Sequence, residues 1–328
     1  MNQSGKCIGR KQLKPDSISI ITPVYNESGN LKILNKRLNA VLETIDILEW
    51  EWIIIDDNSE DNTFEICKEI GQNQPNIRSI KFAKNHGSHH AIFYGLSKAK
   101  NSAAIVLAGD LQDPPELIPN LIKKWHSGNR IVWAARNKPP NESPINNFAS
   151  KVYYLLVSRL VGCKNCFPNG ADFFLLDRVA IEALLKYNES NVSILALISQ
   201  LGFSQDTIFY EKDRRLHGST GWSFDKKLKL VFDTVFSLSY KPIRLMSYAG
   251  FLTSFTGFLF SSHIIVNSYK GSPVEGWSSI MVAVLIIGGI QMLMLGVLGE
   301  YLWRTLIEAK KRPLYIVEED TFENNKNI

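Results

Sequence analysis

The sequence predicts an α/β domain with a mostly parallel sheet, followed by amphipathic interface helices and two transmembrane helices. Short apolar runs alternate with helical patterns between residues 17 and 136, and polar or Gly-containing turns separate them. Two long uncharged apolar runs lie nearer the C-terminus. Strands that alternate with helices form a parallel sheet with helices on both faces, and ligands bind such sheets at the carboxyl ends of the strands.

Each element of the α/β region follows from the spacing of its apolar residues. The runs that predict buried strands are residues 18–22, 52–55, 77–82, 103–108 and 131–135. After the first run, apolar residues recur every three or four positions, which is the spacing of one helix face. These are Leu31, Leu34, Leu38, Leu42 and Ile45. Further helices are predicted over about 63–70, over about 89–98 and from Pro114 and Pro115, where missing N–H groups do no harm.

The composition hides two regions of different polarity. The chain has 328 residues, 45% hydrophobic and 21% charged, which excludes a disordered or collagen-like polymer. Its net charge of +5 and its mean hydropathy of −0.07 would suit a soluble protein. Residues 245–269 and 276–299, however, contain no Asp, Glu, Lys or Arg. Each run is long enough to cross a bilayer, which takes roughly 20 apolar residues.

These patterns divide the chain into five segments. We expect a basic N-terminal tail over 1–16, an α/β domain over 17–221, an amphipathic juxtamembrane helix over 222–244, a transmembrane hairpin over 245–304 with spans at about 246–267 and 279–300, and a C-terminal tail over 305–328. No apolar segment follows the basic tail, so the tail does not read as a signal peptide. Residues 148–161 and 222–240 can lie at a membrane interface or pack as ordinary buried helices.

The cysteines and clustered histidines give weak signals for a metal. Four cysteines are too few for a disulfide scaffold in a chain of this length, and reduced thiols suit a cytosolic location. Cys163 and Cys166 form a single CxxC without the second pair that a structural zinc site needs, so two loop cysteines are the favoured interpretation. His86, His89 and His90 also lack an identifiable fourth ligand.

Polar residues follow three of the predicted strands, at the edge where ligands bind. The turns are Pro23-Val24-Tyr25-Asn26-Glu27, Asp56-Asp57-Asn58-Ser59 and Gly109-Asp110-Leu111-Gln112-Asp113. Any one turn can simply cap the next helix. Three together, with acidic residues, favour a site for a nucleotide diphosphate and a divalent cation, because hard oxygen ligands suit Mg²⁺ or Mn²⁺.

At these turns the sequence resembles the family 2 inverting glycosyltransferases. More narrowly, it resembles the membrane-anchored polyprenyl-phosphate sugar transferases, which include dolichol-phosphate mannose synthases and bacterial undecaprenyl-phosphate glucosyltransferases. The segments that carry the resemblance are the first two turns with Asp61 and Thr63, Asp110-Leu111-Gln112-Asp113-Pro114-Pro115-Glu116, and Arg215 with Gly218 and Thr220. The resemblance covers essentially the whole chain. It implies a GT-A (Rossmann-like) fold and inverting transfer of a hexose from a nucleotide-diphosphate sugar, expected to be a UDP-sugar, to undecaprenyl phosphate.

The resemblance also assigns roles to residues on the donor side. The residues expected to bind the nucleotide sugar are Pro23, Tyr25, Glu27, Asp57, Lys84, Asn85 and Asp110. Asp57 would accept hydrogen bonds from the base, while Asp110 and Gln112 match ligands of a Mg²⁺ or Mn²⁺ cofactor. Asp110 is expected to be catalytic as well. Family members usually carry Asp-x-Asp-Leu-Gln, whereas Ala108 occupies the first position here, which implies weaker metal binding or, alternatively, loss of activity.

On the acceptor side, Asp172 matches the family's candidate catalytic carboxylate, although a loop Asp that caps a turn is the other interpretation. A phosphate monoester, with a second pKa of about 6, is largely ionised at neutral pH and can attack without a base. Asp172 would therefore orient the acceptor or stabilise the transition state. The residues that match the family's lipid-phosphate-binding residues are Arg136, Arg215 and Thr220. One guanidinium group can bind two phosphate oxygens at once, which suits this role. The basic loop around Arg215 can also be merely solvated.

Loop charge predicts the topology. Basic residues flank the two uncharged runs on their outer sides and are scarce between the runs. The positive-inside rule then gives a multi-pass protein of the cytoplasmic (inner) membrane with the catalytic domain and both termini in the cytoplasm. Expected partners are a nucleotide sugar, a polyprenyl phosphate lipid, the membrane, a flippase, a second glycosyltransferase and further copies of the chain as a homo-oligomer, with no nucleic acid. Two alternatives stay open: transfer to another lipid or glycan, and a non-catalytic nucleotide-sugar-binding scaffold.

Overall fold

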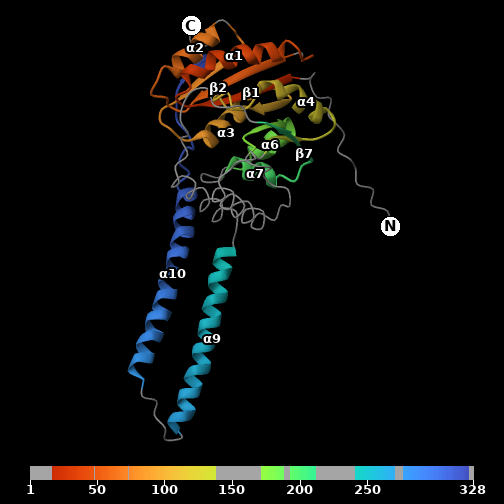
Figure 1. Cartoon of the computed structure of the whole chain (residues 1–328). Coiled ribbons are helices and arrows are strands. Elements are labelled where there is room, and N and C mark those ends of the chain that lie inside the picture. The colour runs from red at the N-terminus through yellow and green to blue at the C-terminus, as the bar shows by residue number, and fades with distance from the viewer. Residues whose placement is uncertain are drawn as a thin grey trace, which may run out of the picture.

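The computed structural model describes residues 17–47, 49–72, 74–137, 171–187, 193–211, 241–269 and 276–324. They form an α/β domain and two long helices that extend from one side of it (Figure 1). Several expectations fall outside these ranges: the basic tail over 1–16, the helices expected over 148–161 and 222–240, the CxxC of Cys163 and Cys166, and the phosphate-binding residues Arg215 and Thr220.

The α/β domain is built on an eight-stranded sheet with the order β7-β5-β6-β4-β1-β2-β3-β8. The strands are β1 Ser17–Val24, β2 Glu49–Asp56, β3 Ile77–Phe82, β4 Ala103–Val106, β5 Ile131–Arg136, β6 Phe173–Asp177, β7 Gln205–Tyr210 and β8 Val317–Asp320. β6 runs antiparallel to β4 and β5, and β8 runs antiparallel to β3; the remaining pairs are parallel. The predicted mostly parallel sheet is confirmed, and β4 ends two residues earlier than the predicted 103–108.

Helices cover both faces of the sheet, as predicted. On one face lie α1 Ser28–Leu42, α2 Thr63–Gln72 and α4 Ile118–His126; on the other lie α3 Ser88–Lys98, α6 Arg178–Leu184 and α7 Ile194–Gln200. The helix predicted from Pro114 and Pro115 begins as a 3-10 turn, Pro115–Leu117, and continues as α4. The central strands β1, β4, β5 and β6 are almost completely buried, and each large apolar side chain removed from water contributes about 1.5–3 kcal/mol.

A glycine lets α3 approach the sheet closely. A Cβ atom on Gly95 would lie 2.4 Å from Ile21 Cγ2 and 2.8 Å from Ile55 Cδ1. Such contacts would push α3 away from β1 and β2. Because α3 begins beside the carboxyl ends of these strands, Gly95 helps to set the position of the loop that precedes α3.

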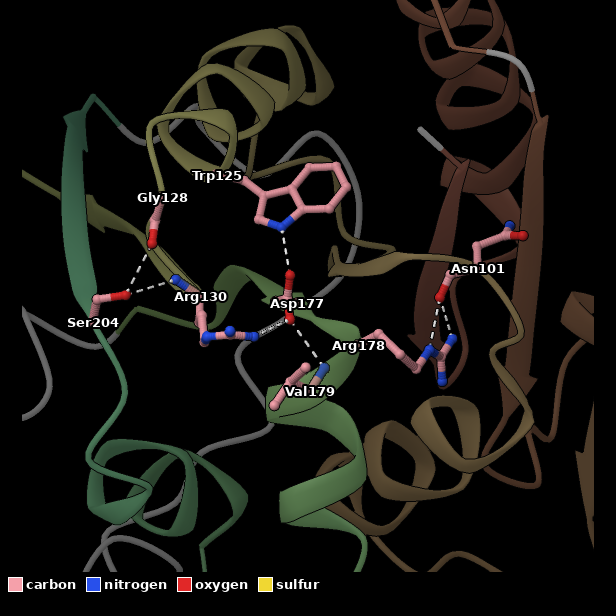
Figure 2. A network of polar contacts seen from close by, with 8 residues as sticks. All are labelled: Asn101, Trp125, Gly128, Arg130, Asp177, Arg178, Val179 and Ser204. Atoms are coloured by element: carbon pink, nitrogen blue, oxygen red, sulfur yellow. Dashed lines mark hydrogen bonds and ion pairs between the residues drawn. The ribbon is translucent and has the colours of Figure 1, made fainter. Parts of the chain in front are cut away.

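The amino edge of the sheet is closed by a hydrogen-bonded network around Asp177, the last residue of β6 (Figure 2). Its carboxylate accepts the Trp125 indole N–H at 2.9 Å, an Arg130 guanidinium N–H at 2.9 Å and the backbone N–H of Val179 at 3.0 Å. The last bond caps the N-terminus of α6. One buried carboxylate thereby joins β5, β6, α4 and α6.

The two long helices are α9 Lys241–Tyr269 and α10 Trp277–Ala309. They lie side by side (Figure 1), and a Cβ atom on Gly250 of α9 would lie 3.2 Å from Met294 Cε of α10. Among the described residues, one helical segment, Val282–Ala309, is long and apolar enough to cross a membrane. After α10 the chain returns to the α/β domain, where β8 and the short helix α11 Thr321–Asn324 follow.

Candidate active site

The turns after β1 and β2 are joined to each other at the carboxyl edge of the sheet. The backbone N–H of Asn26 donates to Ser59 Oγ at 2.9 Å, and Asn26 Oδ1 accepts the backbone N–H of Glu60 at 2.8 Å. Asn26 and Asn58 have φ angles of 55° and 62°, in the left-handed region that Asn tolerates better than most residues. The simple capping interpretation fits Asp61, which accepts the backbone N–H of Thr63 at 3.0 Å at the start of α2. Helix capping does not account for Asn26, whose two hydrogen bonds connect the turn after β1 to the turn after β2.

Asp57 holds the loop between β3 and α3. Its Oδ1 accepts the backbone N–H of His86 and its Oδ2 accepts that of Gly87, both at 2.7 Å. Gly87 has a φ of 90°, which favours glycine. Burial raises the pKa of Asp57, and the two N–H groups oppose that shift. Each carboxylate oxygen has two acceptor sites, so the predicted contact with a base stays compatible with this geometry.

The turn after β4 carries the predicted metal ligands in a strained backbone. Leu111 has a φ of 59°, which costs about 1–2 kcal/mol for a residue with a Cβ atom, and its side chain is fully buried. Asp110 is nearly buried, and its Oδ1 accepts the backbone N–H of Gln112 at 3.1 Å. A Cβ atom on Gly109 would lie 2.7 Å from Val24 Cγ1, so only glycine lets this turn pack against β1. Strain of this kind concentrates at functional sites.

The donor atoms on this turn suit a hard cation. Asp110 and Gln112 offer a carboxylate and an amide oxygen, to which Mg²⁺ or Mn²⁺ would add phosphate oxygens and water. The half-buried Ala108 contributes no ligand. Within the part of the chain that the structure describes, no group of three or more His, Cys, Asp or Glu side chains could hold a metal ion. Asp110 and Gln112 would leave most positions around such a cation to phosphate oxygens and water.

Asp172 and Arg136 lie at the same edge, on the far side of β4. Because β6 is antiparallel, its first residue lies at the carboxyl ends of β4 and β5. Continuing the register past Phe173 places Asp172 level with Ala108 of the metal-ligand turn. Arg136 ends β5. The predicted catalytic carboxylate thus lies next to the turn that carries Asp110. One predicted phosphate-binding arginine lies one strand further along the same edge, at the end of β5.

A buried tyrosine connects these groups. Tyr210 ends β7 opposite Arg136, and its hydroxyl donates to the Asp113 carboxylate. Burial raises the pKa of Tyr210, the charges of Asp113 and Asp172 raise it further, and the charge of Arg136 lowers it. The phenol therefore lies within electrostatic reach of two carboxylates and a guanidinium.

The remaining predicted residues lie on the β1–β3 side of the edge. Pro23 is half-buried at the end of β1, Tyr25 is exposed, and Glu27 Oε2 accepts the Asn30 side-chain N–H at 2.5 Å. Lys84 and Asn85 are exposed in the loop that Asp57 holds. The structure thus brings the predicted residues that it describes to one edge of the sheet, in two groups on either side of β4.

Sequence reasoning missed the contacts that hold this edge in place. The sequence patterns assign no role to Asp113 of the Asp-Leu-Gln-Asp segment or to Tyr210. β7, which ends at Tyr210, is not among the five strands that the apolar runs predict, so its end was no signal for Tyr210. The hydrogen bonds from His86 and Gly87 to Asp57 join distant parts of the chain, so spacing alone could not reveal them.

A mostly parallel sheet whose carboxyl edge gathers an aspartate-held loop, an Asp-Leu-Gln turn, Asp172 and Arg136 has the architecture of a GT-A glycosyltransferase. The family comparison agrees, because residues 19–185 match the model for "Glycosyl transferase family 2". The chain belongs to glycosyltransferase family 2 and is a glycosyltransferase.

Relatives match over nearly the full chain. "Uncharacterized glycosyltransferase YkcC" of Bacillus subtilis (strain 168) is 37% identical over 94% of this chain and 96% of the relative. "Prophage bactoprenol glucosyl transferase homolog" of Escherichia coli (strain K12) is 33% identical over 92% of this chain and 98% of the relative. Among solved structures, glucosyl-3-phosphoglycerate synthase from Mycobacterium tuberculosis has a TM-score of 0.48 at 15% identity, covering 68% of this chain and 78% of that chain.

Proposed function

We propose that this glycosyltransferase transfers a hexose from a UDP-sugar to undecaprenyl phosphate, with inversion, and so makes a lipid-linked sugar donor for cell-envelope glycan modification. Relatives support the acceptor class: besides the Escherichia coli protein, "Bactoprenol glucosyl transferase" of Shigella phage SfV is 31% identical over 92% of this chain and 98% of the relative. The observation that carries the proposal is that Asp172 lies level with the start of the Asp110 turn and that Arg136 ends the next strand at the same edge.

On the donor side, Asp57 would accept hydrogen bonds from the base while holding the loop with Lys84 and Asn85. Pro23, Tyr25 and Glu27 would border the nucleoside. Asp110 and Gln112 would hold Mg²⁺ or Mn²⁺. A bound divalent cation supplies charge neutralisation for the diphosphate leaving group. With Ala108 in place of a second carboxylate, the protein contributes few ligands, and we expect metal affinity to depend on the bound nucleotide.

On the acceptor side, a nonbridging oxygen of the lipid phosphate would attack the anomeric carbon. The new carbon–oxygen bond forms as the bond from that carbon to the diphosphate breaks, and the electron pair leaves with UDP. Arg136, Arg215 and Thr220 would bind the phosphate, and Asp172 would orient it or stabilise positive charge on the sugar. A phosphate that is already ionised needs no general base.

The second substrate is a lipid, so the active site must work at a membrane. We propose that α9 and α10 both span the inner membrane and that the α/β domain and both termini are cytoplasmic. The support is the apolar Val282–Ala309 segment of α10, the uncharged stretch of α9, and basic residues that flank the pair, namely Lys241, Arg244, Arg304, Lys310, Lys311 and Arg312. A flippase, a second glycosyltransferase and further copies of the chain stay predicted partners.

A transfer assay on membranes tests the proposal. Membranes with the full-length protein are incubated with undecaprenyl phosphate, Mn²⁺ and one labelled nucleotide sugar at a time, and mild-acid-labile lipid label is measured. We expect transfer by the wild type and by Glu69→Gln, a surface carboxylate paired with Lys32, and about 100-fold slower transfer by Asp172→Asn. Label in a different lipid or glycan would mean that this molecule, and not undecaprenyl phosphate, is the acceptor. Nucleotide binding without transfer by the wild type would favour the scaffold alternative, which Ala108 motivates.

A further inference from the structure

The chain beyond α10 extends the sheet at the donor side. β8 lies antiparallel to β3, with Asp320 opposite Ile80 and Val317 opposite Phe82. The backbone N–H of Ala83 continues this pairing by donating to the Ile316 carbonyl at 2.9 Å. We refer to residues 314–322 as the C-terminal strap. It connects the apolar helix α10 directly to the strand that leads into the loop held by Asp57.

Specific polar contacts fix the strap in this register. The Arg78 guanidinium forms a two-pronged ion pair with the buried Asp320 carboxylate, in which Nε lies 2.9 Å from Oδ1. Charge-assisted pairs of this geometry are stronger than ordinary hydrogen bonds. The backbone N–H of Ser79 donates to Thr321 Oγ1 at 3.1 Å. The more exposed pair between Lys81 and Glu318 contributes less.

One residue of the strap packs toward the candidate nucleotide site. The Tyr315 ring stacks on Phe82, with centroids 5.7 Å apart and planes 3° apart, and meets the Tyr94 ring edge-on at 4.6 Å. Phe82 in turn meets the His86 ring edge-on at 5.5 Å. The backbone N–H of His86 donates to Asp57. A continuous packed path therefore leads from Tyr315 through Phe82 and His86 to Asp57.

We propose that Tyr315 is a positioning residue for the nucleotide, because it packs the His86–Gly87 loop into the conformation that Asp57 binds. Residues 83–85 of that loop are exposed, so they supply little burial to order it. The strap supplies the missing contacts from one side and Asp57 supplies hydrogen bonds from the other. The consequence for nucleotide affinity rests on the proposed function, in which Asp57, Lys84 and Asn85 border the nucleotide.

The competing explanation is that the strap only covers the edge of β3, as proteins commonly do to block unwanted pairing. Phe322 distinguishes the two explanations. It belongs to the same strap and packs against Arg78, whose Cζ lies 5.6 Å from the ring centroid. Among the residues that the structure describes, it is not one of the ring partners of Phe82 or His86. If the strap acts only as an edge cover, losing Phe322 and losing Tyr315 should affect the loop alike.

The experiment compares full-length Tyr315→Ala, Tyr315→Phe and Phe322→Ala with the wild type in detergent. Hydrogen exchange of the His86 and Gly87 amides and the Kd for UDP with Mn²⁺ are both measured. We expect Tyr315→Ala to raise the exchange rate and the Kd about tenfold, the size of ordering one or two side chains. Tyr315→Phe, which keeps the ring, and Phe322→Ala should stay within about twofold of the wild type on the same scale.

Three results would overturn the inference: unchanged exchange in Tyr315→Ala, equal acceleration in Phe322→Ala, or a loosened loop that binds UDP with unchanged affinity. The exchange measurement needs no nucleotide, so it separates this inference from the proposed function. If Tyr315→Ala loosens the loop while the wild type binds no UDP, the positioning of the loop stands and the proposed donor is wrong. If the loop loosens and UDP binds with unchanged affinity, the role of Tyr315 in nucleotide binding is wrong.

Discussion

The amino edge and the carboxyl edge of the sheet differ in hydrogen bonding and in backbone strain. At the amino edge, polar side chains form hydrogen bonds with the backbone and with each other. Besides the Asp177 network, the Arg178 guanidinium donates to the Asn101 carbonyl at 2.8 Å (Figure 2). At the carboxyl edge, three residues other than glycine adopt positive φ, and buried carboxylates gather there. The three are Asn26, Asn58 and Leu111.

The difference is also visible in the carboxylates themselves. Asp177 is stabilised by a guanidinium, an indole N–H and a helix N-terminus. Asp56 and Asp57, at the end of β2, have pKa values raised by burial, which the hydrogen bonds to them only partly offset. Carboxyl groups with shifted pKa values and strained turns are both typical of functional sites. We therefore expect the amino edge to stabilise the domain and the carboxyl edge to bind the ligand at some cost in stability.

The largest effect should come from removing the predicted metal-ligand carboxylate. We expect Asp110→Asn to slow sugar transfer more than about 100-fold, since even outer partners of metal ligands cost 10–100-fold. The free energy of unfolding should stay near the wild-type value, because the amide keeps the size of the side chain. Transfer rates and thermal unfolding, measured on one preparation, check both parts. A wild-type rate would remove Asp110 from the chemistry.

The opposite pattern is expected at the amino edge. Asp177→Ala removes the cap of α6 and the acceptor for Trp125, together with the partly exposed ion pair to Arg130. We expect a loss of about 2 kcal/mol in unfolding free energy, with an unchanged transfer rate for the protein that stays folded. Urea unfolding and active-site-normalised rates are the measurements. Loss of rate without loss of stability would break the division between the two edges.

Local patterns in the sequence predicted what depends on local burial. β1 to β5 were recognisable because their apolar runs are short and bounded by turns, and the polar residues after β1, β2 and β4 necessarily share one edge. β8 was not recognisable, since Val317 is followed by Glu318, Glu319 and Asp320. Its pairing depends on Arg78 and Lys81, far away in the chain. The hydrogen bonds from His86 and Gly87 to Asp57 also join distant parts of the chain, so the sequence pattern does not predict them.

A histidine on the carboxyl side should make stability depend on pH. His89, in the first turn of α3, has its Nδ1 shielded from solvent, and burial, aided by repulsion from His90, lowers its pKa to about 4. The unfolded chain takes up this proton near pH 6.5, whereas the folded protein does so only near pH 4. Stability is therefore fully present above about pH 6.5 and is lost as the pH falls toward 4.

The pKa difference sets an upper limit of about 3 kcal/mol on the loss. Because His89 is only half-buried as a residue, we expect about 1–2 kcal/mol. Thermal unfolding between pH 7 and pH 4.5 measures it. His89→Gln should flatten this part of the profile, whereas His126→Gln, at an exposed position at the end of α4, should leave it unchanged. A profile equally steep in His89→Gln would assign the pH dependence to other groups.

The smallest effect concerns the strained backbone itself. Asn58 has a φ of 62° between β2 and α2, where a Cβ-bearing residue other than Asn or Asp is disfavoured by about 1 kcal/mol. Asn58→Ala should therefore lower the unfolding free energy by about 1 kcal/mol. Asn58→Gly should change it by only about 0.3 kcal/mol, because glycine adopts this φ without strain. Asn120→Ala, in helical backbone on the exposed surface of α4, should be neutral or stabilising. Urea unfolding of the three variants measures the strain at this turn, and equal stability of Asn58→Ala and Asn58→Gly would mean that the turn relaxes instead of storing strain.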